Sequence, residues 1–173
     1  GKSLTYQVAI GEAVAAPSDG TALLVFPTKA LAQDQLRSFG AFDAPGVVPV
    51  TYDGDTPNED RAWARRHANV LLTNPDMLHV GILPSHARWA SFLMRLRFVV
   101  IDELHTLRGI FGTHVAHLLR RLRRLCAHYG SDPTFVFTSA TIGTPGHLAS
   151  YLCGKDVSEV TGDGSPRGER LFA

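Results

Sequence analysis

The sequence predicts an α/β domain with a mostly parallel sheet and helices on both faces of that sheet. Apolar, β-rich runs alternate along the chain with segments of helical pattern, an order typical of parallel strands joined by crossover helices. The central apolar runs lack polar alternation, as expected for strands that are covered on both faces. With 173 residues, of which 45% are hydrophobic, the chain has the size of one globular domain.

The predicted strands are the apolar, β-rich runs. Five are well defined, at residues 21–26, 47–52, 69–73, 98–101 and 134–138, and a weaker sixth lies at 157–160. Helical patterns fill the gaps between them, at residues 3–15, 28–39, 57–67 and 113–129. Pro57 suits the first position of its helix, and the segment 113–129 carries a continuous apolar stripe at helical spacing.

Composition excludes several classes of protein. The 17 basic and 16 acidic residues give a formal charge of +1, so any nucleic acid is held by local features rather than by a strongly basic surface. No apolar run is long enough to span a membrane, and no signal peptide opens the chain. We therefore expect a soluble, intracellular domain over residues 1–160. Residues 161–173, rich in glycine and charge at their start, are predicted to form a linker.

The chain opens with Gly1-Lys2-Ser3, directly before a helical pattern. These residues are typical of the end of a phosphate-binding loop, where helix N-terminal amides attract phosphate, lysine reaches the β- and γ-phosphates and serine ligates Mg²⁺. Gly1, Lys2 and Ser3 are therefore candidate nucleotide-binding residues, and Ser3 is a candidate magnesium ligand. A chance Gly-Lys-Ser at a helix start is the alternative, because the first half of such a loop is not in this chain.

Asp102 and Glu103 directly follow the apolar segment 98–101. A strand that ends in two carboxylates places both at the carboxyl edge of the sheet, where such folds bind ligands. Asp102 is a candidate Mg²⁺ ligand, and Glu103 is a candidate base that orients and deprotonates a water molecule. Acidic residues that stabilise a helix N-terminus are the alternative. Together with Gly-Lys-Ser, the pair favours a P-loop NTPase that uses ATP and Mg²⁺.

Five short blocks occur in the order typical of superfamily 2 helicases, and the chain resembles that family. Asp102-Glu103-Leu104-His105 resembles the DExH box, and Lys2 and Ser3 would belong to motif I. The blocks that resemble motifs Ia, Ib and III are Pro27-Thr28-Lys29-Ala30-Leu31, Thr73-Asn74-Pro75-Asp76-Met77-Leu78 and Ser139-Ala140-Thr141. This resemblance implies a RecA-like fold over residues 1–160, with residues 161–173 leading toward a second RecA-like domain.

Longer stretches narrow the resemblance to the YprA/MrfA-type helicases, which are RecQ4-like DNA repair enzymes. They lie at residues 52–56, 102–112, 138–143 and 163–169. The resemblance implies an ATP-dependent DNA helicase that moves along single-stranded DNA in the cytoplasm, or at the nucleoid of a bacterium. The second domain would supply an arginine to the ATP site, so we expect the isolated domain to be inactive by itself.

The family also implies roles for individual residues. The catalytic residues would be Lys2, Asp102 and Glu103. Contacts to the sugar-phosphate backbone, which grip a strand without reading its bases, would come from Thr28, Lys29, Thr73 and Asn74. A histidine would link the nucleotide site to motif III, where hydrolysis is coupled to strand movement; these coupling residues would be His105, Ser139, Ala140 and Thr141.

Two other functions stay open. The first is an RNA-dependent ATPase of the DEAD-box type, although Leu104 and His105 replace the Ala-Asp of that type. The second is a non-catalytic module that binds nucleic acid, although the candidate catalytic residues are intact. The basic cluster on the predicted helix 113–129 could touch DNA, touch the second domain or face solvent; it consists of Arg120, Arg121, Arg123 and Arg124.

Overall fold

The computed structural model describes residues 3–15, 18–42, 44–140 and 143–160. A five-stranded sheet forms its centre, with the strand order β2-β3-β1-β4-β5. Every pair of neighbouring strands is parallel, which confirms the predicted fold class. The strands are β1 (Thr21–Val25), β2 (Pro49–Thr51), β3 (Val70–Thr73), β4 (Leu96–Ile101) and β5 (Thr134–Phe137).

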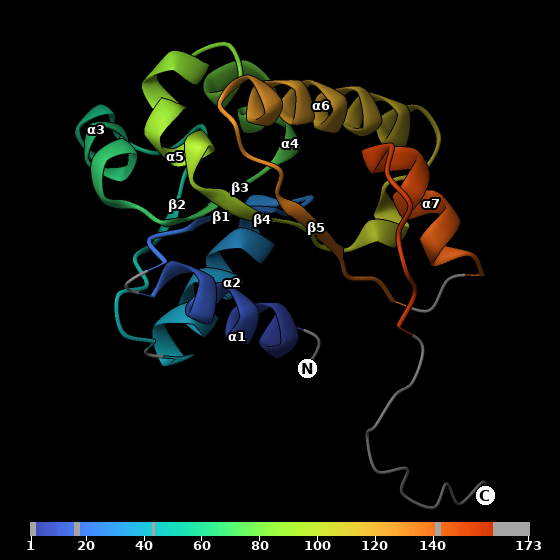
Figure 1. Cartoon of the computed structure of the whole chain (residues 1–173), viewed down its shortest axis with the longest axis horizontal. Helices are drawn as coiled ribbons and strands as arrows, with labels where there is room; N and C mark the ends of the chain where they lie inside the picture. The colour runs from blue at the N-terminus through green and yellow to red at the C-terminus, as the bar shows by residue number, and fades with distance from the viewer. Residues whose placement is uncertain (1–2, 16–17, 43, 141–142, 161–173) are drawn as a thin grey trace, which may run out of the picture.

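Helices cover both faces of the sheet, as Figure 1 shows, with α1 and α2 on one face and α3 to α6 on the other. The longer helices are α1 (Ser3–Val14), α2 (Lys29–Phe42), α3 (Asn58–His67), α6 (Gly109–His128) and α7 (Pro145–Cys153). The shorter ones are α4 (Pro75–Met77), the π-helical turn η1 (Leu78–Ile82), the 3₁₀ turn η2 (His86–Trp89), α5 (Ala90–Met94) and the 3₁₀ turn η3 (Leu104–Thr106). None of the helices in the described residues is long and apolar enough to cross a membrane.

Alternate residues of each central strand pack into two separate cores. In β1, Leu23 and Val25 join the core beneath α4, α5 and α6. Ala22 and Leu24 point the other way, into the core that α1 and α2 cover. Because side chains alternate along a strand and both faces are buried, the strand reads as one continuous apolar run. This two-sided burial explains why the strands could be predicted.

The register of the sheet aligns the ends of its strands. Val25 pairs with Thr73 of β3 and with Ile101 of β4, and Ile101 pairs with Phe137 of β5. The residues that follow these strand ends therefore emerge at one level along the carboxyl edge. Polar groups that are far apart in the sequence are brought together there.

The structure differs from the sequence prediction in several elements. Residues 157–160 form no strand: Val160 is 94% exposed, and Glu159 instead turns its carboxylate toward the backbone N–H of Gly146 at the start of α7. The long helix begins at Gly109 rather than at residue 113, because its first turn contains two glycines, which weaken a helical pattern. The helices between residues 75 and 94 are too short to show a helical period, and α7 was not predicted.

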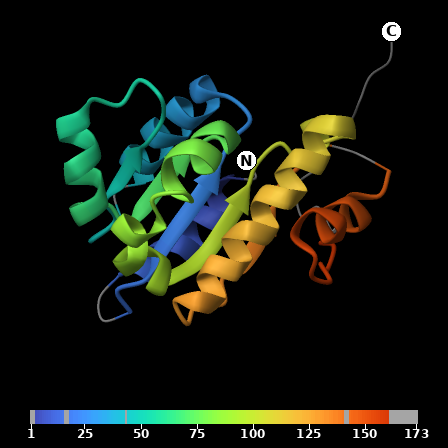
Figure 2. The same cartoon turned by 90° about the horizontal axis from the view of Figure 1, so that it is seen from above.

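The basic cluster on α6 holds neighbouring elements together. Arg123 donates to the carbonyls of Cys153 and Gly154, at 2.8 and 2.9 Å, and so binds the C-terminus of α7. Arg120 lies over the ring of Tyr151, also in α7, and Arg121 donates to Nδ1 of His79 at 2.8 Å. Figure 2 shows α7 beside α6 at the edge of the molecule. Three of the four arginines therefore contact other parts of the domain rather than solvent alone.

Gly112 allows the start of α6 to pack against the segment that leaves the sheet edge. A Cβ at this position would lie 2.5 Å from the carbonyl oxygen of Leu107 and 2.8 Å from its carbonyl carbon. Since backbone atoms cannot move aside cheaply, we expect Gly112→Ala to lower the free energy of unfolding by about 1–3 kcal/mol. The melting temperature, followed by circular dichroism, should fall by roughly 2–4 °C for each kcal/mol.

Gly40 provides the matched control, because it lies in α2 and a Cβ added there would meet no atom within 4 Å. Alanine is the better helix former, so Gly40→Ala should raise the free energy of unfolding by about 0.5–1 kcal/mol. Equal melting temperatures for the two variants would contradict the close approach of Leu107.

Candidate functional site

Asp102 stands at the carboxyl end of β4 with one carboxylate oxygen fixed. Its backbone N–H donates to the carbonyl of Val25 at 3.1 Å and extends the sheet by one residue. Its Oδ1 accepts the backbone N–H of Glu103 at 2.8 Å and the hydroxyl of Thr138, which follows β5. Its Oδ2 accepts no hydrogen bond from the residues that the structure describes. Asp102 can therefore offer Oδ2 to a metal ion or a water molecule.

Glu103 turns the chain sharply away from β4. Its backbone is left-handed, with φ 56° and ψ 45°, which is uncommon for a residue other than glycine and costs on the order of 1–3 kcal/mol. The turn is held by the N–H of Leu104, which donates to the carbonyl of Thr138 at 2.9 Å, and by Thr106, which donates to the carbonyl of Glu103. The Glu103 side chain stays at the carboxyl edge and is 35% exposed, so it can reach water or a ligand.

His105 connects Glu103 to the residues that follow β5. Its Nδ1 lies 3.1 Å from Oε2 of Glu103 and 3.3 Å from the backbone nitrogen of Ala140. An Nδ1 that carries a proton donates to the carboxylate, whereas an Nδ1 without one accepts from Ala140. The two contacts are therefore alternatives. Ser139 is half-buried between Thr138 and Ala140, and Thr141 lies outside the described residues.

The first turn of α1 lies near these carboxylates. Burial raises the pKa of the Tyr6 phenol far above its ordinary value, and the negative charges of Asp102 and Glu103 raise that pKa further. The Tyr6 hydroxyl donates to Oε1 of Gln35 in α2 at 3.1 Å. Ser3 begins α1 and is half-buried. Gly1 and Lys2, the other two residues of the predicted phosphate loop, lie outside the described residues.

A second group of polar residues follows β1 and β3. Thr28 caps α2, since its Oγ1 accepts the N–H of Leu31 at 3.3 Å, and it is exposed. Asn74 caps α4, since its Oδ1 accepts the N–H of Met77 at 2.8 Å. The amide nitrogen of Asn74 donates to none of the described residues and can serve a ligand. Thr73 is different: it is 1% exposed, and its hydroxyl donates to the carbonyl of Tyr52 at 2.7 Å. The Thr73 side chain thus fixes the end of β2 against β3.

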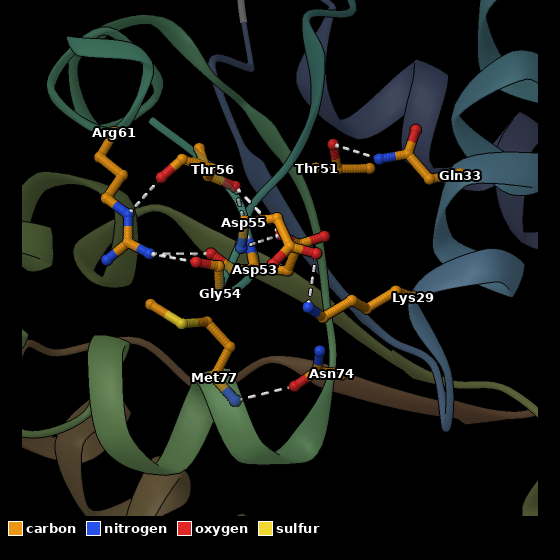
Figure 3. Close-up of polar contacts among 10 residues, drawn as sticks. All are labelled: Lys29, Gln33, Thr51, Asp53, Gly54, Asp55, Thr56, Arg61, Asn74 and Met77. Atoms are coloured by element: carbon orange, nitrogen blue, oxygen red, sulfur yellow. Dashed lines mark hydrogen bonds and ion pairs between the residues drawn. The ribbon is translucent and has the colours of Figure 1, made fainter. Parts of the chain in front are cut away.

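Lys29 is paired with an acidic loop. Its Nζ lies 2.6 Å from Oδ2 of Asp55, and both side chains are exposed. This hydrogen bond holds the pKa of the Lys29 amino group above its ordinary value, so the amine stays charged. Figure 3 shows Lys29 reaching the loop of residues 53–56 from one side, with Asn74 below it. A ligand that binds Lys29 must therefore compete with Asp55.

Arg61 holds the 53–56 loop in place from the opposite side (Figure 3). Its Nε donates to the carbonyl of Thr56 at 2.8 Å, and its Nη2 donates to the carbonyls of Asp53 and Gly54 at 3.0 and 3.3 Å. Within the loop, Oδ1 of Asp53 accepts the N–H of Asp55 at 2.8 Å. The loop is therefore a fixed structure rather than a loose connection.

Sequence analysis did not single out Asp55, Arg61 or Thr138 as functional residues. An Asp-Gly-Asp-Thr turn directly after a predicted strand was the available signal for the loop. Nothing in the sequence pairs this turn with Lys29, because that contact joins residues 26 positions apart and depends on the order of the strands in the sheet. The Arg61 contacts are local, but an arginine on a helix that follows a turn is no signal by itself.

The chain matches a known protein family and known helicases. Residues 1–148 match the family described as DEAD/DEAH box helicase. The uncharacterized ATP-dependent helicase YprA of Bacillus subtilis is 46% identical over 99% of this chain and 23% of its own length. The ATP-dependent helicase HRQ1 of Saccharomyces cerevisiae is 44% identical over 98% of this chain and 16% of its own length.

Solved structures show the same relationship. The crystal structure of the DUF1998 helicase MrfA bound to DNA and AMPPNP matches 97% of this chain and 24% of that protein, with a TM-score of 0.93 and 47% identity. The DEAD-box helicase Mss116 bound to ssRNA is 16% identical with a TM-score of 0.71, and shares the fold. These likenesses confirm the predicted RecA-like helicase fold. The chain spans less than a quarter of the length of the relatives YprA, HRQ1 and MrfA.

Proposed function

Because the chain belongs to the DEAD/DEAH box helicase family, we propose that it is the ATP-binding domain of a DNA helicase. In this proposal the full-length protein hydrolyses ATP, moves along single-stranded DNA and separates the strands of a duplex during DNA repair. The main support is the carboxyl edge, where Asp102 and Glu103 stand in register with the strand ends that carry Thr28 and Asn74. Because the ATP site and the DNA-contacting residues share this edge of the sheet, hydrolysis of ATP can change how the domain binds the DNA strand.

The nucleotide side of the proposal uses Lys2, Ser3, Asp102 and Glu103. Mg²⁺ takes oxygen ligands, and the free Oδ2 of Asp102 and the hydroxyl of Ser3 are ligands of that kind. The ion would neutralise phosphate charge when bound, and Gly1 and Lys2 would hold the phosphates. Glu103 would orient and deprotonate the attacking water. The half-buried side chain of Glu103, which still reaches solvent beside the fixed carboxylate of Asp102, supports this division of roles.

The proposed DNA-binding residues are Thr28, Lys29 and Asn74. They would contact the sugar and phosphate groups of the strand, which carry no sequence information. Thr73, with its buried hydroxyl, positions Asn74 by fixing the end of β3 to β2. DNA is favoured over RNA because the structure of MrfA, 47% identical to this chain, is described as bound to DNA.

Coupling between the two sides would pass through His105. Its two alternative hydrogen bonds, to Glu103 and to the backbone of Ala140, connect the water-activating carboxylate to the segment of Ser139, Ala140 and Thr141. A second RecA-like domain of the same protein, reached through residues 161–173, would close over this edge and supply an arginine. We propose a cytoplasmic location for the protein.

A strand-separation assay tests this function. The full-length protein is incubated with a DNA duplex that carries a single-stranded extension, and release of the shorter strand is followed. The proposal requires release with ATP and Mg²⁺ and none with a non-hydrolysable ATP analogue. Release that is equal with the analogue would contradict ATP-driven separation.

Asp55→Asn is expected to tighten binding of single-stranded DNA. The substitution removes the charge that holds Lys29 at 2.6 Å, so Lys29 can engage a phosphate without losing an ion pair. An exposed pair contributes about 0.2–1 kcal/mol, so the dissociation constant should fall by roughly 1.5- to 5-fold. Fluorescence anisotropy with a labelled oligonucleotide measures the change.

Asp34→Asn is the matched control, because Asp34 forms an exposed ion pair with Arg37 on the same helix as Lys29. Both substitutions remove one negative charge, so they alter long-range attraction to DNA alike. Equal affinities of the two variants would show that Asp55 does not compete with DNA for Lys29.

A further inference from the structure

A pocket rich in arginine lies between α3 and the turns η1 and η2, next to the loop of residues 53–56 that pairs with Lys29. It is a pocket of about 430 Å³, lined by the guanidinium-bearing side chains of Arg61, Arg65 and Arg88 and by the polar residues Asn58, Ser85 and Tyr52. We call it the arginine pocket. Its arginines come from two segments, residues 61–65 and residue 88, that are neighbours only in the folded chain.

The charges in the arginine pocket are largely uncompensated. No aspartate or glutamate is among its described lining residues. Arg88 is exposed, and its side chain forms no hydrogen bond or ion pair with the residues that the structure describes; its backbone N–H donates to the carbonyl of Ser85 at 2.9 Å. Among the described residues, the Arg65 side chain donates only to the Tyr52 hydroxyl, at 3.3 Å. Arg61 uses Nε and Nη2 on the 53–56 loop, which leaves Nη1. Guanidinium groups stay charged at any physiological pH and match phosphate oxygens in geometry, so a phosphate is the ligand that this lining fits.

The arginine pocket continues the row of strand contacts. The ends of β1 and β3 carry Thr28 and Asn74, and β2 is the next strand in the sheet. Tyr52, which follows β2, lines the pocket, and its carbonyl accepts the hydroxyl of Thr73. Arg61 touches both the pocket and the loop that carries Asp55, the partner of Lys29. Arg61 is therefore the link between the pocket and the carboxyl edge, where a DNA strand that contacts Thr28 and Asn74 would approach the end of β2.

We propose that the arginine pocket binds a backbone phosphate of the same single DNA strand that contacts Thr28, Lys29 and Asn74. This inference rests on the proposed function, because it assumes that a strand crosses the carboxyl edge. It adds a phosphate site beyond motif Ib and assigns Arg88 and Arg65 as its ligands. Arg61 both binds the phosphate and fixes the neighbouring loop.

The test measures how binding of single-stranded DNA to the full-length protein depends on salt. Arg65→Gln combined with Arg88→Gln removes two charges from the pocket and leaves the Arg61 contacts to the loop intact. The loss of one phosphate contact on a single strand makes the slope of log K against log salt shallower by about 0.7. Arg88→Lys alone keeps a positive charge at the site, so most of the wild-type slope should be retained. Arg66→Gln, an exposed neighbour in α3 outside the pocket lining, is the control.

Each outcome separates the inference from its premise. A shallower slope in the double variant, with an unchanged slope in Arg66→Gln, is the expected result. The double variant could instead keep the wild-type slope while Thr28→Ala with Asn74→Ala still weakens DNA binding. This result would overturn the phosphate site in the arginine pocket but not the proposed function. Tripolyphosphate that binds the wild-type protein but not the double variant, while the slope for DNA is unchanged, would assign the pocket to a free anion and also overturn the inference. No binding of single strands by the wild-type protein would overturn both proposals.

Discussion

Glu103→Gln is expected to lower ATP hydrolysis by the full-length protein by about 10²- to 10⁴-fold, the contribution typical of a general base. The amide has the shape of the carboxylate but cannot take a proton from water. Glutamine, like glutamate, has an unbranched Cβ, so the strain of the left-handed backbone at this position does not change. The hydrogen bonds to Oδ1 of Asp102 do not involve the Glu103 side chain. Binding of ATP should therefore persist. Hydrolysis is measured by phosphate release, and binding by titration with a fluorescent ATP analogue.

Glu12→Gln serves as the control, since Glu12 is an exposed carboxylate on α1. It should hydrolyse ATP at the wild-type rate. Undiminished hydrolysis in Glu103→Gln would remove Glu103 from its catalytic role, and loss of ATP binding would assign it to nucleotide binding instead.

Thr138→Val is expected to weaken the use of Mg²⁺ by about 10- to 100-fold, the usual cost of losing a partner that orients a metal ligand. Thr138 is nearly buried, and its hydroxyl donates to Oδ1 of Asp102. Valine keeps the shape of the side chain but leaves this oxygen, among the described residues, with only the backbone N–H of Glu103 as a donor. ATP hydrolysis by the full-length protein is measured over a range of Mg²⁺ concentrations.

The expected signature is a higher Mg²⁺ requirement, with activity that recovers in excess Mg²⁺. Thr113→Val is the control, because it also removes a threonine hydroxyl that donates within the domain, at 3.2 Å to the carbonyl of Gly109. A loss of activity in Thr138→Val that excess Mg²⁺ leaves unchanged would contradict the placement of Mg²⁺ at Asp102.

The features that could be predicted are those that residues close together in the sequence determine. The strands could be predicted because both of their faces are buried, and the position of Asp102 and Glu103 at the carboxyl edge because the carboxylates directly follow an apolar run. Parallel strands present their carboxyl ends at one edge, so Thr28 and Asn74 could be expected near these residues. The aligned register of Val25, Thr73 and Ile101 bears out that expectation.

The parts that could not be predicted depend on tertiary contacts. Lys29 and Asp55 are 26 positions apart, and their ion pair follows from the order of the strands. The buried hydroxyl of Thr73 depends on β2 lying next to β3, although its motif suggests a surface contact. The residues 157–160 have strand propensity but find no pairing partner, because Glu159 is used at the start of α7. Arg65 looks like an ordinary surface residue until Arg88 is placed beside the same pocket.

The most direct measurement of the central claim is ATP hydrolysis by the full-length protein without nucleic acid, with single-stranded DNA and with single-stranded RNA. We expect low hydrolysis by the protein alone and strong stimulation by DNA, with little effect of RNA. Stimulation by RNA in place of DNA would indicate an RNA-dependent ATPase. No hydrolysis under any of the three conditions, with DNA still bound, would contradict the catalytic role of this domain and leave a module that only binds nucleic acid.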